Sequence, residues 1–198
     1  MAHSCDWPDS NKNETSIGLM KILSALCFFL FLTGSLFSQV RFYAEKSNVT
    51  FFSDGIIEDI TAENTNVTSI FDARKGEIAF LIKIKDFQFQ KKLMQVHFNE
   101  KFMESEKFPK STFVGTLKGF DMNKTGVQNV TASSRLFIHG INKDVTMPGT
   151  LEVKDRNIVM KSKFKVKLAD YNITIPQVIW QNISEEVEVT VNFIYSPL

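Results

Sequence analysis

The sequence predicts one all-β domain of about eight antiparallel strands, folded as a barrel or a sandwich, behind an N-terminal leader. Three observations predict this class. Apolar and polar residues alternate over long segments after residue 48, short polar turn sequences separate these segments, and 19 of the 198 residues are Phe. Phe has a large apolar area and no polar group, so it suits a wide, dry interior. With 43% hydrophobic residues, the chain can bury one sizeable core.

The N-terminal segment has the layout of a secretory signal peptide. Lys21 precedes an apolar run at 22–32, and small residues follow, with Ser35 and Ser38 as the candidate cleavage positions. A membrane span needs roughly 20 apolar residues, so the run is short for one, although a retained N-terminal anchor stays open as an alternative. We therefore expect export to the bacterial periplasm or beyond, with no stable membrane span after signal cleavage.

The leader and the domain meet near residue 38. Residues 1–19 are polar and have no place in a signal peptide, so Met20 is the expected start. We assign residues 1–38 to the leader and signal peptide and residues 39–198 to the β domain. Both cysteines of the chain lie in the leader. The domain therefore has no disulfide and must be stabilised by its own core.

Strands with one buried and one solvent-facing side are predicted along the domain. The alternation is clearest in 76–85, 157–168 and 185–195, where one face is apolar and the other is mostly charged or polar. Further strands are expected near 49–53, 65–71, 111–121, 128–138 and 144–153.

Turns and longer connections complete the pattern. Two segments do not follow the strand period: 87–108 is expected to be a loop with a short helical piece, and 169–184, which contains Pro176, a long connection that caps one end. Short Gly- or Asn-bearing turns are expected at 74–76, 123–126, 139–144 and 154–157.

Catalytic and metal-binding chemistry has little support in the sequence. The segment 121–126, DMNKTG, is similar to the start of a calcium loop, but Ala132 stands where that loop needs a bidentate Glu. His97 and His139 are the only histidines after the leader, and neither HExxH nor GxSxG is present. The net charge of +1 gives no field that suggests nucleic acid. We predict no catalytic residue and no metal, and keep an enzyme as a minor alternative.

Two motifs carry a family resemblance. In 100–117 a short helix leads through an aromatic–Pro pair into a strand, and in 134–153 a strand ends in an aliphatic–His–Gly–aliphatic turn. The motif residues are Phe102, Ser105, Phe108, Pro109 and Phe113 in the first, and Ile138, His139, Gly140, Ile141, Lys143, Val145 and Thr146 in the second. With 164–176, they resemble the YceI-like family of lipid- and polyisoprenoid-binding proteins. The family's Ile-Asp opening and the His-Ser pair after it are missing here.

The resemblance implies an extended eight-stranded antiparallel lipocalin-like β-barrel with a short helical cover. Its apolar channel would hold a polyisoprenoid, an isoprenoid quinone or another lipid, and no other cofactor is implied. We therefore expect a non-enzymatic binder or carrier, with a homodimer as one alternative for its assembly. Since an eight-stranded lumen is either filled by side chains or holds a small ligand, a ligand-free structural or stress-related envelope protein stays open as the second hypothesis.

Candidate site residues follow from the inward faces of the strands and from the cover. The residues expected to line the lumen are Phe51, Phe80, Ile82, Phe113, Phe164, Val189 and Phe193. Those expected to cover one end are His97, Phe98, Phe102 and Phe108.

Overall fold

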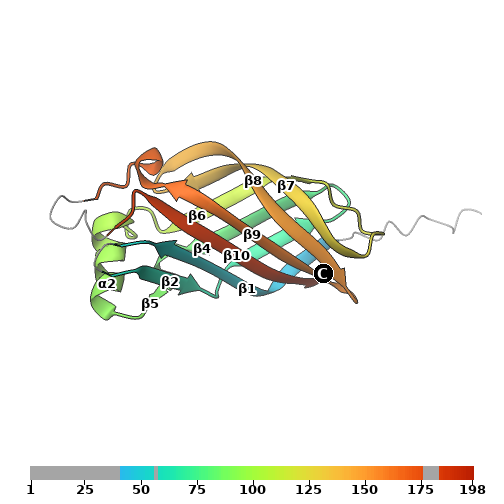
Figure 1. Ribbon diagram of the computed structural model, residues 1–198, viewed down its shortest axis with the longest axis horizontal. Coiled ribbons are helices and arrows are strands. Elements are labelled where there is room, and N and C mark those ends of the chain that lie inside the picture. The colour runs from blue at the N-terminus through green and yellow to red at the C-terminus, as the bar shows by residue number, and fades with distance from the viewer. Residues whose placement is uncertain (1–40, 56–57, 176–182) are drawn as a thin grey trace, which may run out of the picture. The chain divides into compact units, whose positions relative to one another are not determined.

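The alternating segments form an antiparallel barrel in the computed structural model, which describes residues 41–55, 58–175 and 183–198. The predicted leader lies outside these ranges. Eight strands close the barrel, and two further strands and a short helix lie at one end of it, shown at the left of Figure 1. The predicted fold class is confirmed. Over the residues described, no helix is both long enough and apolar enough to cross a membrane.

The strands follow one another mostly through short links. They are β1 (Arg41–Ser53), β2 (Ile60–Asn64), β3 (Thr68–Asp72), β4 (Glu77–Lys83), β5 (Gln88–Phe89), β6 (Lys110–Lys118), β7 (Gly126–Ile138), β8 (Ile141–Lys154), β9 (Asn157–Lys167) and β10 (Glu186–Pro197). The helical segments are a 3₁₀ turn at Ile84–Asp86, α2 (Lys92–His97), a π turn at Phe98–Phe102 and a 3₁₀ turn at Leu168–Tyr171. We call residues 84–108, which include α2, the end cover.

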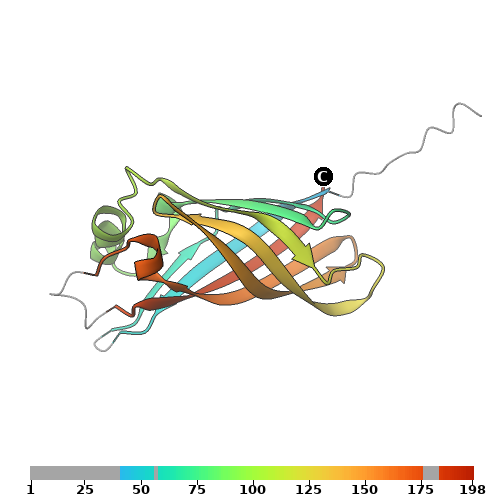
Figure 2. The ribbon, with the colours of Figure 1, turned by 90° about the horizontal axis from the view of Figure 1, so that it is seen from above.

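Strand pairing closes the barrel and then forks at one place. The neighbouring order is β10-β9-β8-β7-β6-β4-β3-β1, and β1 also pairs with β10. On its other edge, β1 pairs with β3 at Arg41–Tyr43 and with β2 at Val49–Ser53. β2 pairs in turn with β5. The sheet therefore splits beside the end cover, and β2 and β5 extend its wall (Figures 1 and 2).

Two polar side chains stabilise the connection between β2 and β3, where the sheet splits. Asn64 is fully buried; its amide donates to the Lys83 carbonyl at 3.0 Å and accepts from the Asn66 N–H at 2.9 Å. The Ser47 hydroxyl donates to the Thr65 carbonyl at 3.0 Å and accepts from the Val67 N–H at 2.9 Å. These side chains satisfy backbone groups that lose their strand partners at the split.

The sequence reading missed the first half of β1. We expected a strand only at 49–53, but β1 begins at Arg41. The first part was missed because a β-bulge between Ala44 and Lys46 interrupts the alternation. Phe42 is buried before the bulge and Val49 after it, so the inward positions change from even to odd numbers. Because a bulge shifts the two-residue period, alternation alone does not detect such a strand. β2 and β5 were also not predicted, since each is short.

The predicted turns and connections agree with the structure in position, with bounds shifted by a few residues and most clearly at 139–144. The expected turn at 139–144 is limited to His139 and Gly140, because β8 already begins at Ile141. The region 87–108 contains β5, α2 and the π turn, as a loop with a short helical piece. The predicted connection at 169–184 begins with the 3₁₀ turn, and its residues 176–182, including Pro176, lie outside the described ranges.

The barrel end opposite the cover is filled with aromatic rings. Phe71 and Tyr195 are fully buried, and their ring centroids lie 6.0 Å apart, while Phe120 lies 5.6 Å from Phe71. The Tyr195 hydroxyl is 2.6 Å from the Ser69 hydroxyl, which donates to the Ala79 carbonyl at 2.9 Å. Burial raises the pKa of Tyr195, so the phenol stays neutral and can donate to Ser69. We call this the filled end.

Truncation at the filled end should be costly. We expect Phe71→Ala to lower the free energy of unfolding by about 3–5 kcal/mol, because the ring is fully enclosed and its removal leaves a cavity. Tyr195→Phe, the control, keeps the ring and removes one hydrogen bond, so it should cost only about 1 kcal/mol. Urea unfolding measures both. Equal losses for the two variants would contradict tight packing at this end.

Candidate functional site

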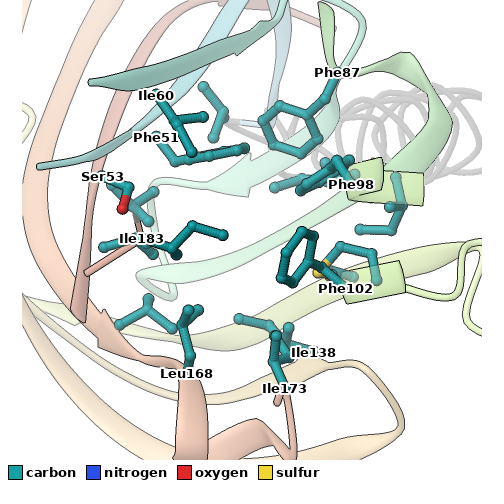
Figure 3. A pocket seen from close by; sticks show the side chains of 18 of the residues that line it. Phe51, Ser53, Ile60, Phe87, Phe98, Phe102, Ile138, Leu168, Ile173 and Ile183 are labelled. Carbon is teal, nitrogen blue, oxygen red and sulfur yellow. The ribbon is translucent and has the colours of Figure 1, made fainter. Parts of the chain in front are cut away.

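The inward faces of the strands leave an apolar cavity of about 320 Å³ beneath the end cover. β1, β4, β6, β7, β9 and β10 all contribute to its wall, and the end cover closes over it. Figure 3 shows aromatic and aliphatic side chains converging on the cavity from several sides. Ligand pockets in proteins usually measure about 300–1,000 Å³ and are mostly apolar. The barrel is thus filled at one end and hollow at the other.

The predicted lumen residues fall into two groups. Five line the cavity: Phe51, Phe80, Ile82, Phe164 and Val189. Phe113 and Phe193 are buried deeper and do not. The Phe113 ring stacks on that of Phe80 with a centroid distance of 4.6 Å, and the Phe193 ring meets Phe80 edge-on at 5.8 Å. These rings form the floor of the cavity, and a small void of about 30 Å³ lies beside Phe80 and Phe113.

Four Phe rings close the cavity on the side of the end cover. Phe51 of β1 stacks on Phe98 with a centroid distance of 5.4 Å, and Phe87 and Phe89 meet Phe51 edge-on at 5.5 and 5.7 Å. Phe98 and Phe102 both line the cavity and are labelled in Figure 3. His97 also lines it, but its side chain is largely exposed. The predicted cover residues His97, Phe98 and Phe102 therefore meet at the cavity.

Phe108 is the predicted cover residue that does not line the cavity. Its ring meets the His139 ring edge-on, with centroids 4.5 Å apart. A Cβ at Gly140, where φ is +80°, would lie 2.6 Å from the Phe108 ring, so this position requires glycine. The two sequence motifs, about 30 residues apart, thus pack against each other, and Phe108 anchors the cover instead of facing the lumen.

His139 ties three segments together at this anchor. Its side chain is 8% exposed, with Nδ1 3.0 Å from the Tyr171 carbonyl and Nε2 3.1 Å from the Glu104 carboxylate. Both partners are acceptors, so the two bonds form together only when each ring nitrogen carries a proton. Glu104 belongs to the end cover and Tyr171 to the 3₁₀ turn after β9. His139 is therefore a structural link between the cover and the barrel.

Several cavity residues were not found from the sequence. They include Ile60, Phe87, Phe89, Met94, Leu168, Ile173 and Ile183. These seven lie in short strands, the short helix α2 or connections, where neither a two-residue nor a helical period is long enough to assign a face. Val49, Leu136 and Val191 were also missed, although they lie on the inner faces of long strands. The Phe-x-Phe spacing at 87–89 is the one signal that could have indicated a short strand.

The cavity wall carries few polar groups. Among the described lining residues, the only titratable side chains are Glu58 and His97, and there is no Lys or Arg. Glu58 pairs with Lys91 at 2.7 Å. The side-chain hydroxyls of Ser53, Ser111 and Thr112 complete the polar set. Such a wall can exclude water from an apolar chain, but it offers no cation to a buried anion.

The metal-ligating side chains of the described residues do not cluster. Within the described ranges, no group of three or more His, Cys, Asp or Glu side chains is arranged to hold a metal ion. In the calcium-like segment, the Asp121 carboxylate accepts the Asn123 N–H at 2.9 Å, and the Gln128 amide accepts the Asp121 N–H at 2.9 Å. Local hydrogen bonds of this kind are typical of an Asx turn between strands.

The fold and the cavity define a class: a closed antiparallel, lipocalin-like barrel with an apolar cavity in its lumen. Within this class, the chain belongs to the YceI-like domain family, whose sequence model matches residues 38–195. The resemblance inferred from the two motifs is thereby confirmed.

Two solved structures share this fold. One is a polyisoprenoid binding domain from Saccharophagus degradans implicated in plant cell wall breakdown, with a TM-score of 0.69 and 15% identity, over 81% of this chain and 100% of that one. The other is BcnA of Burkholderia cenocepacia, with a TM-score of 0.64 and 16% identity, over 75% of this chain and 95% of that one. Comparison with curated proteins gave no match.

Loss of the His139 side chain should loosen the end cover. We expect His139→Ala to lower the free energy of unfolding by about 2–3 kcal/mol, because it removes the buried ring that contacts the Tyr171 carbonyl, the Glu104 carboxylate and the Phe108 ring. Amide hydrogen exchange should increase at 98–108. Lys143→Ala, the control, removes a solvent-exposed pair with Asp170 and should cost less than about 1 kcal/mol. An unchanged exchange rate at 98–108 would contradict the anchoring role.

Proposed function

We propose that this protein is an exported, non-enzymatic binder and carrier of an apolar chain, held in the barrel lumen. The ligand class is a polyisoprenoid, an isoprenoid quinone or another lipid. The observation that carries the proposal is the cavity of about 320 Å³, whose wall is almost wholly apolar. Burial of apolar surface contributes roughly 25 cal/mol per Å², so an apolar chain can be bound there with few polar contacts.

The comparisons support the same proposal. Membership of the YceI-like domain family and the fold shared with a polyisoprenoid binding domain both agree with a lipid ligand. The position of the cavity adds to this support. It lies beneath the end cover, which is held to the barrel by the His139 contacts and could be displaced while the filled end keeps the barrel folded. A carrier needs such a division between a stable part and an opening.

Bound lipid tests the proposal directly. Protein purified from its source without detergent should release an apolar molecule on organic extraction, and native mass spectrometry should show the corresponding added mass. The proposal fails if neither method detects an apolar molecule and the purified protein also takes up no added prenyl lipid.

A substitution that fills the cavity gives a sharper test. Val189 lines the cavity, so Val189→Trp should occupy the ligand's space and reduce lipid uptake at least about tenfold while the barrel stays folded. Val114→Trp adds the same ring on the outer face, where Val114 is 62% exposed, and should leave uptake unchanged. Competition with a fluorescent prenyl lipid measures both. Equal uptake by the two variants would place the ligand outside the lumen.

Export is part of the proposal and rests on the signal-like sequence before the domain. Expression in a Gram-negative host should deliver the protein to the periplasm, with a mature N-terminus immediately after Ser35 or Ser38. N-terminal sequencing of the periplasmic fraction measures this. An uncleaved protein retained in the cytoplasm would contradict export and leave lipid binding to be judged by the preceding experiments.

A further inference from the structure

Ser111 is an exception in the apolar wall of the cavity. It occupies the inner face of β6, two residues before the buried ring of Phe113, and it lines the cavity with only 6% of its surface exposed. Within the described part of the chain, the Ser111 hydroxyl makes no hydrogen bond, whereas the buried Ser69 hydroxyl bonds to two partners. Its oxygen is not enclosed by protein, since the fully buried side-chain atoms without a partner among the described residues are the amide oxygens of Asn48 and Asn99. The Ser111 hydroxyl is therefore free to bond to a molecule in the cavity.

Ser53 supplies a second hydroxyl to the same cavity. It is the last residue of β1, is 1% exposed, and lines the cavity together with Ser111 (Figure 3 labels Ser53). Its Oγ accepts a hydrogen bond from the Ser184 N–H at 2.9 Å, so the oxygen has a structural role. The Ser53 hydroxyl hydrogen has no acceptor among the described residues. Since each hydroxyl has one hydrogen to donate, the cavity presents two donors.

The charges around the cavity restrict what those donors can bind. Glu58 is the only carboxylate in the described lining, and no Lys or Arg lines the cavity to neutralise an anion. A phosphate or carboxylate placed beside Ser111 would lose its hydration without gaining a cation, which is strongly unfavourable. An uncharged acceptor, such as a ketone, quinone, ester or ether oxygen, loses much less hydration and can accept a hydrogen bond from a hydroxyl of the wall.

We propose that the cavity selects lipids whose polar group is an uncharged hydrogen-bond acceptor, and that Ser111, assisted by Ser53, binds this group. The inference rests on the proposed function and adds the chemistry of the ligand's head to it. Both serines lie at the ends of their strands nearest the end cover, β1 ending at Ser53 and β6 beginning one residue before Ser111. The apolar tail then points inward, toward Phe80 and the floor of the cavity.

A chain-matched set of three compounds tests this selectivity. Farnesylacetone carries a ketone, its deoxygenated analogue is a hydrocarbon with a methylene in place of the carbonyl, and farnesyl diphosphate carries a charged head on the same farnesyl unit. Dissociation constants are measured by competition with a fluorescent prenyl lipid. For the unmodified protein we expect the ketone to bind about three- to tenfold more tightly than the hydrocarbon, as one or two hydrogen bonds would give, and the diphosphate to bind most weakly.

Ser111→Ala identifies the group responsible. It should abolish most of the ketone's advantage and leave the hydrocarbon's dissociation constant unchanged. Because the hydroxyl has no protein partner, the variant should unfold at the same or a higher temperature than the unmodified protein. Ser134→Ala is the matched control, since its hydroxyl donates to the Val114 carbonyl at 3.0 Å and does not line the cavity. It should keep the ketone's advantage intact.

The outcomes separate this inference from the proposed function. Equal binding of ketone and hydrocarbon, tightest binding of the diphosphate, or an equal weakening of all three by Ser111→Ala would overturn the selectivity while leaving a lipid-binding barrel. Failure of all three compounds to bind would overturn the proposed function and the selectivity together.

Discussion

Antiparallel pairing of β1 with β10 closes the barrel, and the other features of the molecule depend on this closure. The pairing runs from Phe42 opposite Pro197 to Phe52 opposite Glu188, across the bulge in β1. It joins the first and last strands of the domain, so neither is left as an exposed edge. Closure also creates a separate interior, which a domain without disulfides must fill with its own side chains or share with a ligand.

The interior is divided because its two ends are built differently. At the filled end, rings from β3, β10 and the segment after β6 meet around Phe71, and the buried Tyr195 hydroxyl is satisfied by Ser69. At the other end, β2 takes the place of β3 as the neighbour of β1 and pairs with its residues Val49–Ser53. The Asn64 amide donates to the Lys83 carbonyl where the two pairings separate. The wall is extended there and the Phe rings of this end pack along it and under the cover, so a cavity remains between them. Stability and binding capacity are thus located at opposite ends of one barrel.

The end cover is held to the barrel by polar contacts as well as by aromatic packing on Phe51. His139 connects Glu104 of the cover with Tyr171 beyond β9, and Phe108 packs on the same imidazole. The cavity beneath the cover has the opposite character, since apolar side chains dominate it and its described lining contains no cation. A neutral, largely apolar ligand is what such a wall can desolvate at low cost. The polar anchor stands outside the cavity and does not compete with the ligand.

The alternation of apolar and polar residues determined the fold class, most strand positions and the inward faces of β4, β9 and β10, because a two-residue period directly assigns each side chain to a face. It could not show the first half of β1, where the bulge reverses that assignment. Nor could it show that Phe113 and Phe193 lie in the floor while Phe51 and Phe164 border free space, since all four share the same pattern of inward positions. Only the tertiary structure decided where the lumen is filled and where it is hollow. The volume left inside a closed sheet depends on which side chains meet across the barrel, and these come from residues far apart in the chain.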